Sequence, residues 1–294
     1  MMKAGATVQR VNGPSVSGLV MPKQSWTHIS AKKFVVRQPD YAARKQKAAS
    51  AESLYELMGV DWYRAEKRLA RVGDRVDLPR AQFSHPSVPS LLIVNVQLPS
   101  EGPKMFGTPP ADGPTLHAVF YFTLREETAR ALRGSAPLEP SLRLLVDYFS
   151  RAESESAVRK RFKALGIVNN LDVVNFNPLM GPFNGKPVLI TESGSLERGI
   201  REAGRSNGTG CDGRGHLGAG GDVGLPAGGA KGSPTTDPGV AGARFSPEEF
   251  LELDINVRRW SFLARKGLEK LEPKFGQLNV SVAFLIEGRE DGEV

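Results

Sequence analysis

The sequence has few of the residues on which catalytic chemistry depends. Its only cysteine is Cys211, so an intrachain disulfide is excluded and a reducing compartment is expected. Its four histidines lie far apart, and neither a C-x-x-C nor a G-x-S-x-G motif occurs. Zinc sites and nucleophile-elbow hydrolases need such patterns. We therefore expect no catalytic residue, no cofactor and no metal.

Long apolar runs are also missing. No run approaches the roughly 18 residues that cross a bilayer, and the N-terminus lacks the continuous apolar stretch of a secretory signal. We therefore expect a cytoplasmic protein without a transmembrane segment, at most peripherally bound to a membrane. Residues 1–24 contain no acid, and Ser, Thr, Lys and Arg are scattered among them. We interpret residues 1–25 as a flexible basic leader, and organelle targeting is the alternative.

Negative charge is scarce in the first part of the chain. Residues 1–50 contain nine Lys and Arg and one acid, Asp40, whereas the rest of the chain is nearly balanced. A local basic segment favours contact with an anionic surface, by attraction that salt screens beyond about 8 Å. Nucleic acid is disfavoured as the partner, because the few Tyr and Trp are not interleaved with basic residues and no RNP-like strand motif occurs.

One segment has almost no large apolar residues. Residues 204–243 are dominated by Gly, with Ala, Pro, Ser and Asp, a composition that cannot bury enough surface to offset the entropy lost on ordering. Strand-like sequence lies on both sides of it. We therefore predict a disordered Gly-rich insert within a single domain over residues 26–290, since the cost of closing a loop grows slowly with its length.

The rest of the sequence has the periodicities of a mixed fold. Alternating apolar residues predict main strands over residues 92–98, 118–124, 251–257 and 278–286, and shorter ones over 34–37, 168–176 and 188–191. Helical spacing occurs over residues 51–58, 63–72, 138–149, 154–165 and 260–271. Strands and helices do not alternate regularly, so we predict an α+β fold with a twisted, largely antiparallel sheet packed with several helices. Each strand should then have one buried and one wetter face.

Short polar side chains share one face of two predicted strands. Glu252 and Asp254 are two residues apart, as are Asn95 and Gln97. A solvent-facing stripe is one interpretation, and a carboxylate pair for acid–base or cation chemistry is another. If the two strands are neighbours, the four residues could instead form a polar wall inside a ligand cavity. We take all four as candidate pocket residues.

A basic cluster lies in the predicted helix over residues 154–165. It consists of Arg159, Arg161 and Lys163. Guanidinium groups bind phosphate bidentately, so these residues are candidate ligands for phosphate or a lipid headgroup. The alternative is an ordinary charged helix surface.

Seven short motifs occur in an order that resembles a known family. They are Arg37 with Tyr41 and Lys47, Val94-Asn95-Val96-Gln97-Leu98-Pro99, Tyr121-Phe122, Arg161-Phe162-Lys163, Lys186-Pro187-Val188-Leu189, Phe250-Leu251-Glu252-Leu253-Asp254 and Ala283-Phe284-Leu285-Ile286-Glu287. The resemblance is to the C-terminal domain of the plant protein Enhanced Disease Resistance 2, and it covers most of the chain, from about Trp26 to Glu287.

The resemblance implies a role near membranes but assigns no catalytic residue. Related proteins often carry pleckstrin-homology and START lipid-binding domains ahead of this region, which implies lipid-linked signalling in a plant or alga. The residues on either side of Arg161-Phe162-Lys163 depart from the family pattern, being Ala157-Val158-Arg159 and Ala164-Leu165-Gly166. We therefore expect a divergent, standalone member of the family.

The leading hypothesis is a non-catalytic module that binds a lipid or an anionic membrane surface. Arg37 and Lys47, from the basic N-terminal segment, join the candidate lipid- or phosphate-binding residues. A protein-interaction domain without a lipid ligand is the alternative, with the Gly-rich loop and a sheet edge as contact surfaces. An enzyme acting through Glu252 and Asp254 is the third hypothesis.

Overall fold

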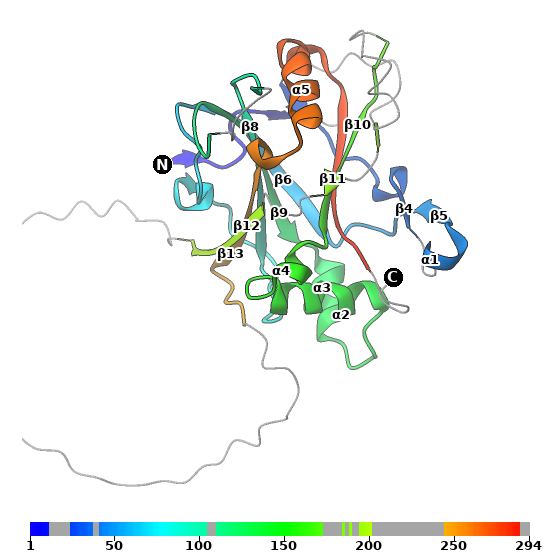
Figure 1. Ribbon diagram of the computed structural model, residues 1–294. Coiled ribbons are helices and arrows are strands. Elements are labelled where there is room, and N and C mark those ends of the chain that lie inside the picture. The colour runs from blue at the N-terminus through cyan, green and yellow to red at the C-terminus, as the bar shows by residue number, and fades with distance from the viewer. Residues whose placement is uncertain are drawn as a thin grey trace, which may run out of the picture.

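The computed structural model describes residues 1–11, 24–37, 41–104, 110–172, 184–185, 188–189, 194–201 and 244–288 (Figure 1). The predicted Gly-rich insert over residues 204–243 lies outside these ranges, so its disorder stays a prediction. Residues 12–23 of the predicted leader also lie outside them.

A mixed sheet of five strands forms the centre of the fold (Figure 1). In spatial order its strands are β12 (Gly194–Ile200), β13 (Glu249–Asn256), β8 (Leu91–Pro99), β9 (Thr115–Leu124) and β6 (Tyr55–Ala65). Neighbouring strands are antiparallel except β13 and β8, which are parallel. A parallel pair needs a long connection, and most of the helices lie in the chain between β8 and β13. The predicted α+β class is confirmed.

A second, smaller sheet packs against the first. Its central strand β10 (Phe162–Val168) is antiparallel to both β11 (Val188–Leu189) and β14 (Val280–Ile286). The Phe284 ring of β14 makes edge contacts with two rings of β9, at 5.3 Å from Phe120 and 5.9 Å from Phe122 between ring centroids. Such aromatic pairs stabilise the junction beyond the area they bury.

Three helices lie together at one end of the central sheet (Figure 1). They are α2 (Glu126–Arg133), α3 (Pro140–Arg151) and the single turn α4 (Ser156–Arg159). Leu145 and Phe149 of α3 are one helical turn apart and pack in one apolar core with Val94 and Leu253 of the sheet. This core covers one face of the strands β13, β8 and β9.

Helix α5 (Phe262–Leu271) lies at the other end of the molecule (Figure 1). Ser261 caps it, because its hydroxyl accepts a hydrogen bond from the Ala264 N–H at 3.3 Å. The 3₁₀ turns η4 (Val257–Arg259) and η5 (Glu272–Gln277) connect α5 to β13 and β14. Phe275 of η5 meets Trp62 of β6 edge-on.

Irregular segments cover the opposite face of the central sheet. The main one is residues 67–78, which contain the 3₁₀ turn η2 (Val72–Asp74) and the short strand β7 (Val76–Asp77). Val72 packs in a second apolar core with Ile93 and Phe250 of the sheet. Both faces of β8 and β13 are therefore buried, and the prediction of a wetter face on these strands is wrong.

The start of the chain also packs on the central sheet. Gly5 and Thr7 lie on this face, whereas Val8 packs with Trp26 and Val60 in a third cluster beside Phe120. β1 (Met2–Lys3) pairs with β7, and β2 (Gln9–Arg10) pairs with β3 (Ser25–Trp26). The Asp61 carboxylate of β6 accepts hydrogen bonds from the N–H groups of Gly5 and Thr7, at 2.7 and 2.8 Å. The interpretation of these residues as part of a flexible leader is wrong, because a buried carboxylate needs donors and they supply them.

A small basic hairpin projects from the side of the molecule (Figure 1). It begins with the 3₁₀ turn η1 (Ala31–Lys33) and continues with β4 (Val35–Arg37), α1 (Tyr41–Arg44) and β5 (Lys47–Ala49). The two strands are antiparallel, with Arg37 directly opposite Lys47. We call residues 31–49 the basic hairpin.

The strongest sequence periodicities are confirmed, and the weaker helical ones are wrong. The four main strands and the helices over residues 138–149 and 260–271 form close to their predicted bounds. Strand β6 over residues 55–65 takes the place of the end of the predicted helix over 51–58 and the start of the one over 63–72, because pairing with β9 outweighs their weak helical spacing. The predicted helix over residues 154–165 stops at Arg159, and Phe162 begins β10. Most of the predicted strand over residues 168–176 lies outside the described residues.

Candidate functional site

The four predicted pocket residues lie side by side. The parallel register of β13 and β8 places Asp254 opposite Asn95 and Asn256 opposite Gln97. Glu252 is one step along the same face, because side chains two residues apart on a strand point the same way. Sequence spacing predicted each pair of neighbours, but the strand order was needed to bring the two pairs together.

These polar side chains are buried beneath residues 67–73. Glu252, Asp254, Asn95 and Gln97 are each at most 1% exposed. The solvent-facing interpretation is therefore wrong for all four. The cavity interpretation required these four residues to be buried neighbours, and they are. Their polar atoms, however, form hydrogen bonds to residues 67–73, which cover them.

Glu252 binds the backbone of the covering segment. Its two carboxylate oxygens accept hydrogen bonds from the N–H groups of Val72 and Gly73, both at 2.8 Å. Two backbone donors on one carboxylate form the same arrangement that holds anions at turns and helix N-termini. Here the anion belongs to the protein itself, so the contact fixes η2 on the sheet.

Asn95 connects the two strands to the covering segment. Its side-chain amide donates to Asp254 Oδ1 at 2.6 Å and to the Leu69 carbonyl oxygen at 3.0 Å. The Gln97 amide donates to the same Leu69 oxygen at 3.0 Å. Buried amides that bond within the protein in this way satisfy their hydrogen-bonding capacity and specify one packing arrangement.

His117 completes the network from β9. Its Nε2 accepts a hydrogen bond from the Leu69 N–H at 3.3 Å, so the ring hydrogen is on Nδ1, which lies 2.9 Å from Asn95 Oδ1. Burial, helped by the charge of Arg68, lowers the pKa of His117 to about 4. The sequence pattern does not place His117 beside Asn95, because their proximity depends on the register of β9 against β8.

Ionisation of one of the two buried carboxyls opposes ionisation of the other. Burial, the negative charge of Glu252 and a hydrogen bond to it raise the pKa of Asp254 to about 8. Burial also raises the pKa of Glu252. We place the proton on Asp254, because both oxygens of Glu252 already accept backbone N–H groups. Among the described residues, no group of three His, Cys, Asp or Glu side chains could hold a metal ion.

The predicted basic cluster is divided between two places. Arg159 Nη1 donates to the carbonyl oxygens of Ala152 and Glu153, at 2.6 and 3.2 Å, and so binds the C-terminal end of α3. Cations favour that end of a helix, where carbonyl groups lack intrahelical partners. Arg159 therefore serves the helix in this structure.

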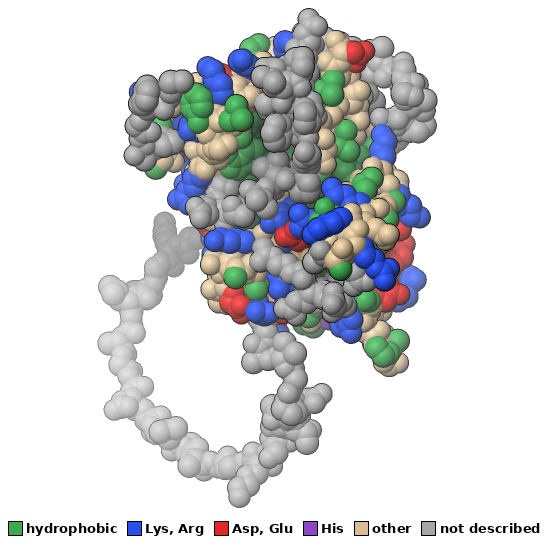
Figure 2. All heavy atoms as spheres, turned by 45° about the vertical axis from the view of Figure 1, so that its right-hand side comes forward, with side chains coloured by type: hydrophobic (Ala, Val, Ile, Leu, Met, Phe, Trp, Pro, Cys, Tyr) green, Lys and Arg blue, Asp and Glu red, His purple; other side chains and the backbone are tan. Residues whose placement is uncertain are grey.

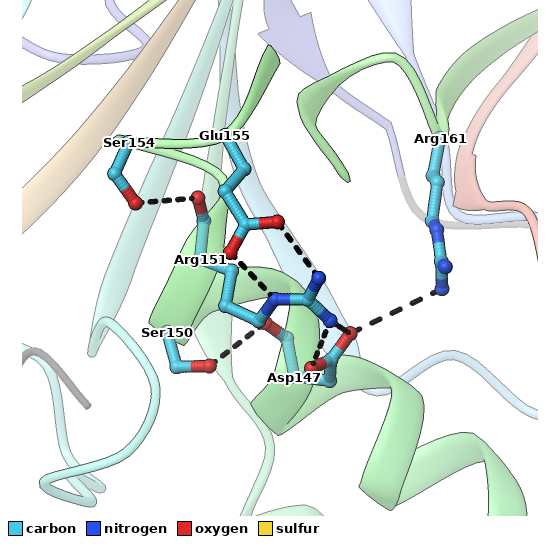
Figure 3. Close-up of polar contacts among 6 residues, drawn as sticks. All are labelled: Asp147, Ser150, Arg151, Ser154, Glu155 and Arg161. Carbon is cyan, nitrogen blue, oxygen red and sulfur yellow. Dashed lines mark hydrogen bonds and ion pairs between the residues drawn. The ribbon is translucent and has the colours of Figure 1, made fainter. Parts of the chain in front are cut away.

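Arg161 points toward the exposed side of α3 (Figure 3). Its Nη1 lies 4.0 Å from Asp147. Asp147 also binds Arg151, whose guanidinium lies between Asp147 at 2.9 Å and Glu155 at 2.7 Å (Figure 3). Asp147 of α3 and Glu155, which follows α3, thus neutralise much of the positive charge here, and this pairing depends on where the helix lies.

Lys163 and Arg37 meet at one carboxylate. The side chain of Lys163 is 3% exposed, and its Nζ lies 3.6 Å from Glu287 Oε2. Arg37 Nη1 lies 2.6 Å from the other oxygen, Glu287 Oε1. Lys47 lies beside them, opposite Arg37 in the hairpin. The structure therefore brings together three of the five predicted basic residues and adds Glu287.

Comparison with protein families gives one match. The family model described as protein ENHANCED DISEASE RESISTANCE 2, C-terminal, matches residues 26–201 and 222–294. This chain belongs to that family. The family match includes β4, which carries Arg37, and the segment with Glu287. The break in the match, residues 202–221, overlaps the predicted Gly-rich insert. Comparisons with curated proteins and with solved structures give no match.

Proposed function

We propose that this member of the family is a non-catalytic module that binds an anionic lipid surface through the basic hairpin. The observation that carries the proposal is the charge and exposure of the hairpin. Residues 31–49 contain six Lys and Arg and one acid. Lys33, Lys45 and Lys47 are exposed, and Figure 2 shows Lys and Arg side chains gathered on this side of the molecule.

The hairpin also has groups suited to the interfacial region of a bilayer. Val35 is 56% exposed. Arg37 and Lys45 lie over the ring of Tyr41, at 4.8 and 5.5 Å from its centroid. Aromatic side chains with adjacent cations favour the headgroup region, where apolar and charged groups both find partners.

The energies are sufficient for reversible binding. Each Lys or Arg near an anionic membrane contributes about 1 kcal/mol, so four to six together would hold the domain at the surface. Arg37 and Lys32 are already paired with Glu287 and Glu52, at 2.6 and 3.0 Å, so their contribution is reduced. None of the helices in the described part of the chain has both the length and the apolarity to span a bilayer.

The non-catalytic part of the proposal rests on the buried polar network. Glu252 and Asp254 are the paired carboxyls that an enzyme would use, and their oxygens bond to Val72, Gly73 and Asn95. A general acid or base must reach its substrate within hydrogen-bond distance. Reaching these groups would require removal of residues 67–73 from the sheet.

Vesicle flotation tests the proposal. The double variant Lys45→Gln and Lys47→Gln removes two exposed charges from the hairpin, and the control Lys266→Gln with Lys270→Gln removes the same charge from α5. Wild type and control should float with phosphatidylserine vesicles at low salt and the hairpin variant should not. Equal recovery of wild type with neutral and anionic vesicles would refute the proposal.

A protein-interaction role is the second candidate, favoured by one feature. Strand β6 is at the edge of the central sheet and exposes two large apolar side chains, Met58 at 40% and Trp62 at 37%. Exposed apolar side chains of this kind are typical of surfaces that contact a partner protein. Replacing Trp62 with Ser should abolish a stoichiometric complex recovered from native extract if this role is correct, and should leave vesicle flotation unchanged.

A further inference from the structure

We propose that Arg37 and Lys163 form a phosphate subsite, and that Glu287 occupies it as an internal competitor when no ligand is bound. The inference rests on the proposed function and names the ligand chemistry: a phosphate monoester, either on a lipid headgroup or free in solution. Its basis is the single carboxylate held between two cations that come from distant parts of the chain.

The backbone fixes Glu287 at this place. Glu287 directly follows β14, and its N–H donates to the Arg161 carbonyl oxygen at 2.8 Å. Its carboxylate then reaches Arg37 at 2.6 Å and Lys163 at 3.6 Å. In Figure 1 the end of β14 lies between the helices and the hairpin that carries Arg37. The position of the carboxylate is thus set by the sheet and does not depend on a free surface rotamer alone.

The three side chains extend from the interior to the surface of the protein. Lys163 is 3% exposed, Glu287 is 18% exposed and Arg37 is 57% exposed. The ammonium group of Lys163 is held in place by a 2.6 Å hydrogen bond to the Lys160 carbonyl oxygen. A buried cation of this kind is costly without an anion beside it.

A phosphate monoester suits these two cations better than one carboxylate does. It carries about −1.5 to −2 charges near neutral pH and three acceptor oxygens. Arginine binds such an oxygen fork bidentately, and lysine binds it as a point charge. Glu287 and the ligand therefore compete for the same donors, so the ligand must displace the Glu287 side chain toward solvent, which its partial exposure permits.

An alternative role for Glu287 predicts a different result. If the carboxylate serves only to tie the hairpin to β14, its removal lowers stability and brings no gain in anion binding. If it is an internal competitor, its removal raises the affinity for a phosphate monoester. Glu287→Gln tests both, because the amide keeps the size of the side chain and removes its charge.

The matched control is Glu52→Gln. Glu52 is exposed and pairs with Lys32 at 3.0 Å, beside the same hairpin. Both variants change the net charge by the same amount, but only Glu287→Gln alters the carboxylate between Arg37 and Lys163. A general electrostatic effect on membrane binding should appear in both variants, and competition for the subsite should appear in one.

The experiment compares binding of the full chain to three probes. They are phosphatidic acid vesicles, which present phosphate monoesters, phosphatidylserine vesicles matched in charge, which present diesters, and inorganic phosphate in solution. We expect Glu287→Gln to bind phosphatidic acid at least about fivefold more tightly than wild type, the lower end of usual coupling energies. Glu52→Gln should show no preference for the monoester. Adding Arg37→Gln to Glu287→Gln should remove the gain, and Arg37 is exposed enough for this variant to fold.

The outcomes separate this inference from the proposed function. If wild type floats with phosphatidylserine but Glu287→Gln gains nothing on any monoester probe, the subsite is refuted and surface binding stands. If no variant floats with any vesicle but Glu287→Gln gains affinity for inorganic phosphate, the subsite stands with a free phosphate ligand and surface binding fails. A thermal melt of each variant identifies loss of folding, and equal gains in Glu287→Gln and Glu52→Gln refute the subsite.

Discussion

The side-chain amide of Asn95 donates a 2.6 Å hydrogen bond to the Asp254 carboxyl across the one parallel pair in the central sheet. Both residues are buried, and the Asn95 oxygen faces His117 on the next strand. A neutral Asp254 suits this setting, because its neighbour Glu252 already places one negative charge beneath residues 67–73. The network therefore has a definite protonation state, which leads to the first prediction.

Asp254→Asn should make stability less sensitive to rising pH. The pKa of Asp254 is raised from 3.8 to about 8 in the folded protein, so its contribution is fully present below 3.8 and is lost as pH rises through 8. The pKa of His117 is lowered from 6.5 to about 4, so His117 makes the free energy of unfolding rise with pH between those values. Between pH 6.5 and 8, Asp254 is the one of these two residues that still makes the free energy of unfolding depend on pH. Urea unfolding should show Asp254→Asn gaining on wild type there by up to about 1.4 kcal/mol per pH unit.

The control for this prediction is Asp77→Asn. Asp77 is exposed on β7, so the same loss of a carboxyl should leave the difference from wild type nearly constant over this window. A difference between wild type and Asp254→Asn that stays equally constant over this window would contradict a proton on Asp254, because a carboxyl ionised in both the folded and the unfolded state gives no pH dependence.

Glu252→Gln should be far more damaging than Asp254→Asn. Glutamine has one acceptor oxygen, so one of the buried N–H groups of Val72 and Gly73 would lose its acceptor and face an amide donor. An unsatisfied buried donor costs about 1–3 kcal/mol, and Glu252→Ala, which leaves both donors unpaired, should cost more. Denaturant unfolding measures the loss, and hydrogen exchange should show the Val72 and Gly73 amides opening first. Equal free energies of unfolding for Glu252→Gln and Asp254→Asn would refute the prediction that Glu252 matters more.

The periodicity of the sequence predicted the central strands because their apolar residues alternate over long runs. It could not predict which strands are neighbours. The meeting of Asp254 with Asn95 depends on a parallel pair between strands more than 150 residues apart, and no local signal specifies that pairing. The same limit hid His117, which joins the network only through the register of β9.

Local patterns were misread where tertiary contacts override them. Arg159, Arg161 and Lys163 were assigned to one helix, but the chain changes from helix to strand at Phe162. Arg161 lies in the turn between α4 and β10, whereas Lys163 belongs to β10, whose pairing with β14 brings it to Glu287. The covering segment over residues 67–73 lies largely in the predicted helix over residues 63–72, but its place depends on hydrogen bonds to buried side chains of the sheet.

Asp61→Asn should release the first residues of the chain from the sheet. The carboxylate accepts hydrogen bonds from two N–H groups, of Gly5 and Thr7, and from two hydroxyls, of Thr7 and Tyr63. Burial opposes its ionisation, but these bonds together lower the pKa of Asp61. Its contribution is therefore present above pH 3.8 and lost as pH falls through the folded value. Hydrogen exchange at the Gly5 and Thr7 amides should quicken in the variant.

Thr7 supplies the control for that experiment. Its hydroxyl donates to Asp61 and accepts from the Trp62 N–H at 2.7 Å, so Thr7→Ser should keep both bonds and Thr7→Val should lose both. Protection of Gly5 that is equal in wild type and Asp61→Asn would show that apolar contacts alone hold this segment.

Gly199→Ala should destabilise the fold through one steric contact. Gly199 of β12 pairs with Phe250 of β13, and a Cβ at Gly199 would overlap the Phe250 ring. Overpacking of a buried site usually costs about 1–3 kcal/mol. Gly166→Ala in β10 is the matched control, because a Cβ there meets no atom within 4 Å and the change should be nearly neutral. Phe250→Leu leaves space beside Gly199, so it should cost less in the Gly199→Ala background than in wild type. Additive losses in the double variant would show that the damage comes from the backbone of β12 and not from the Phe250 ring.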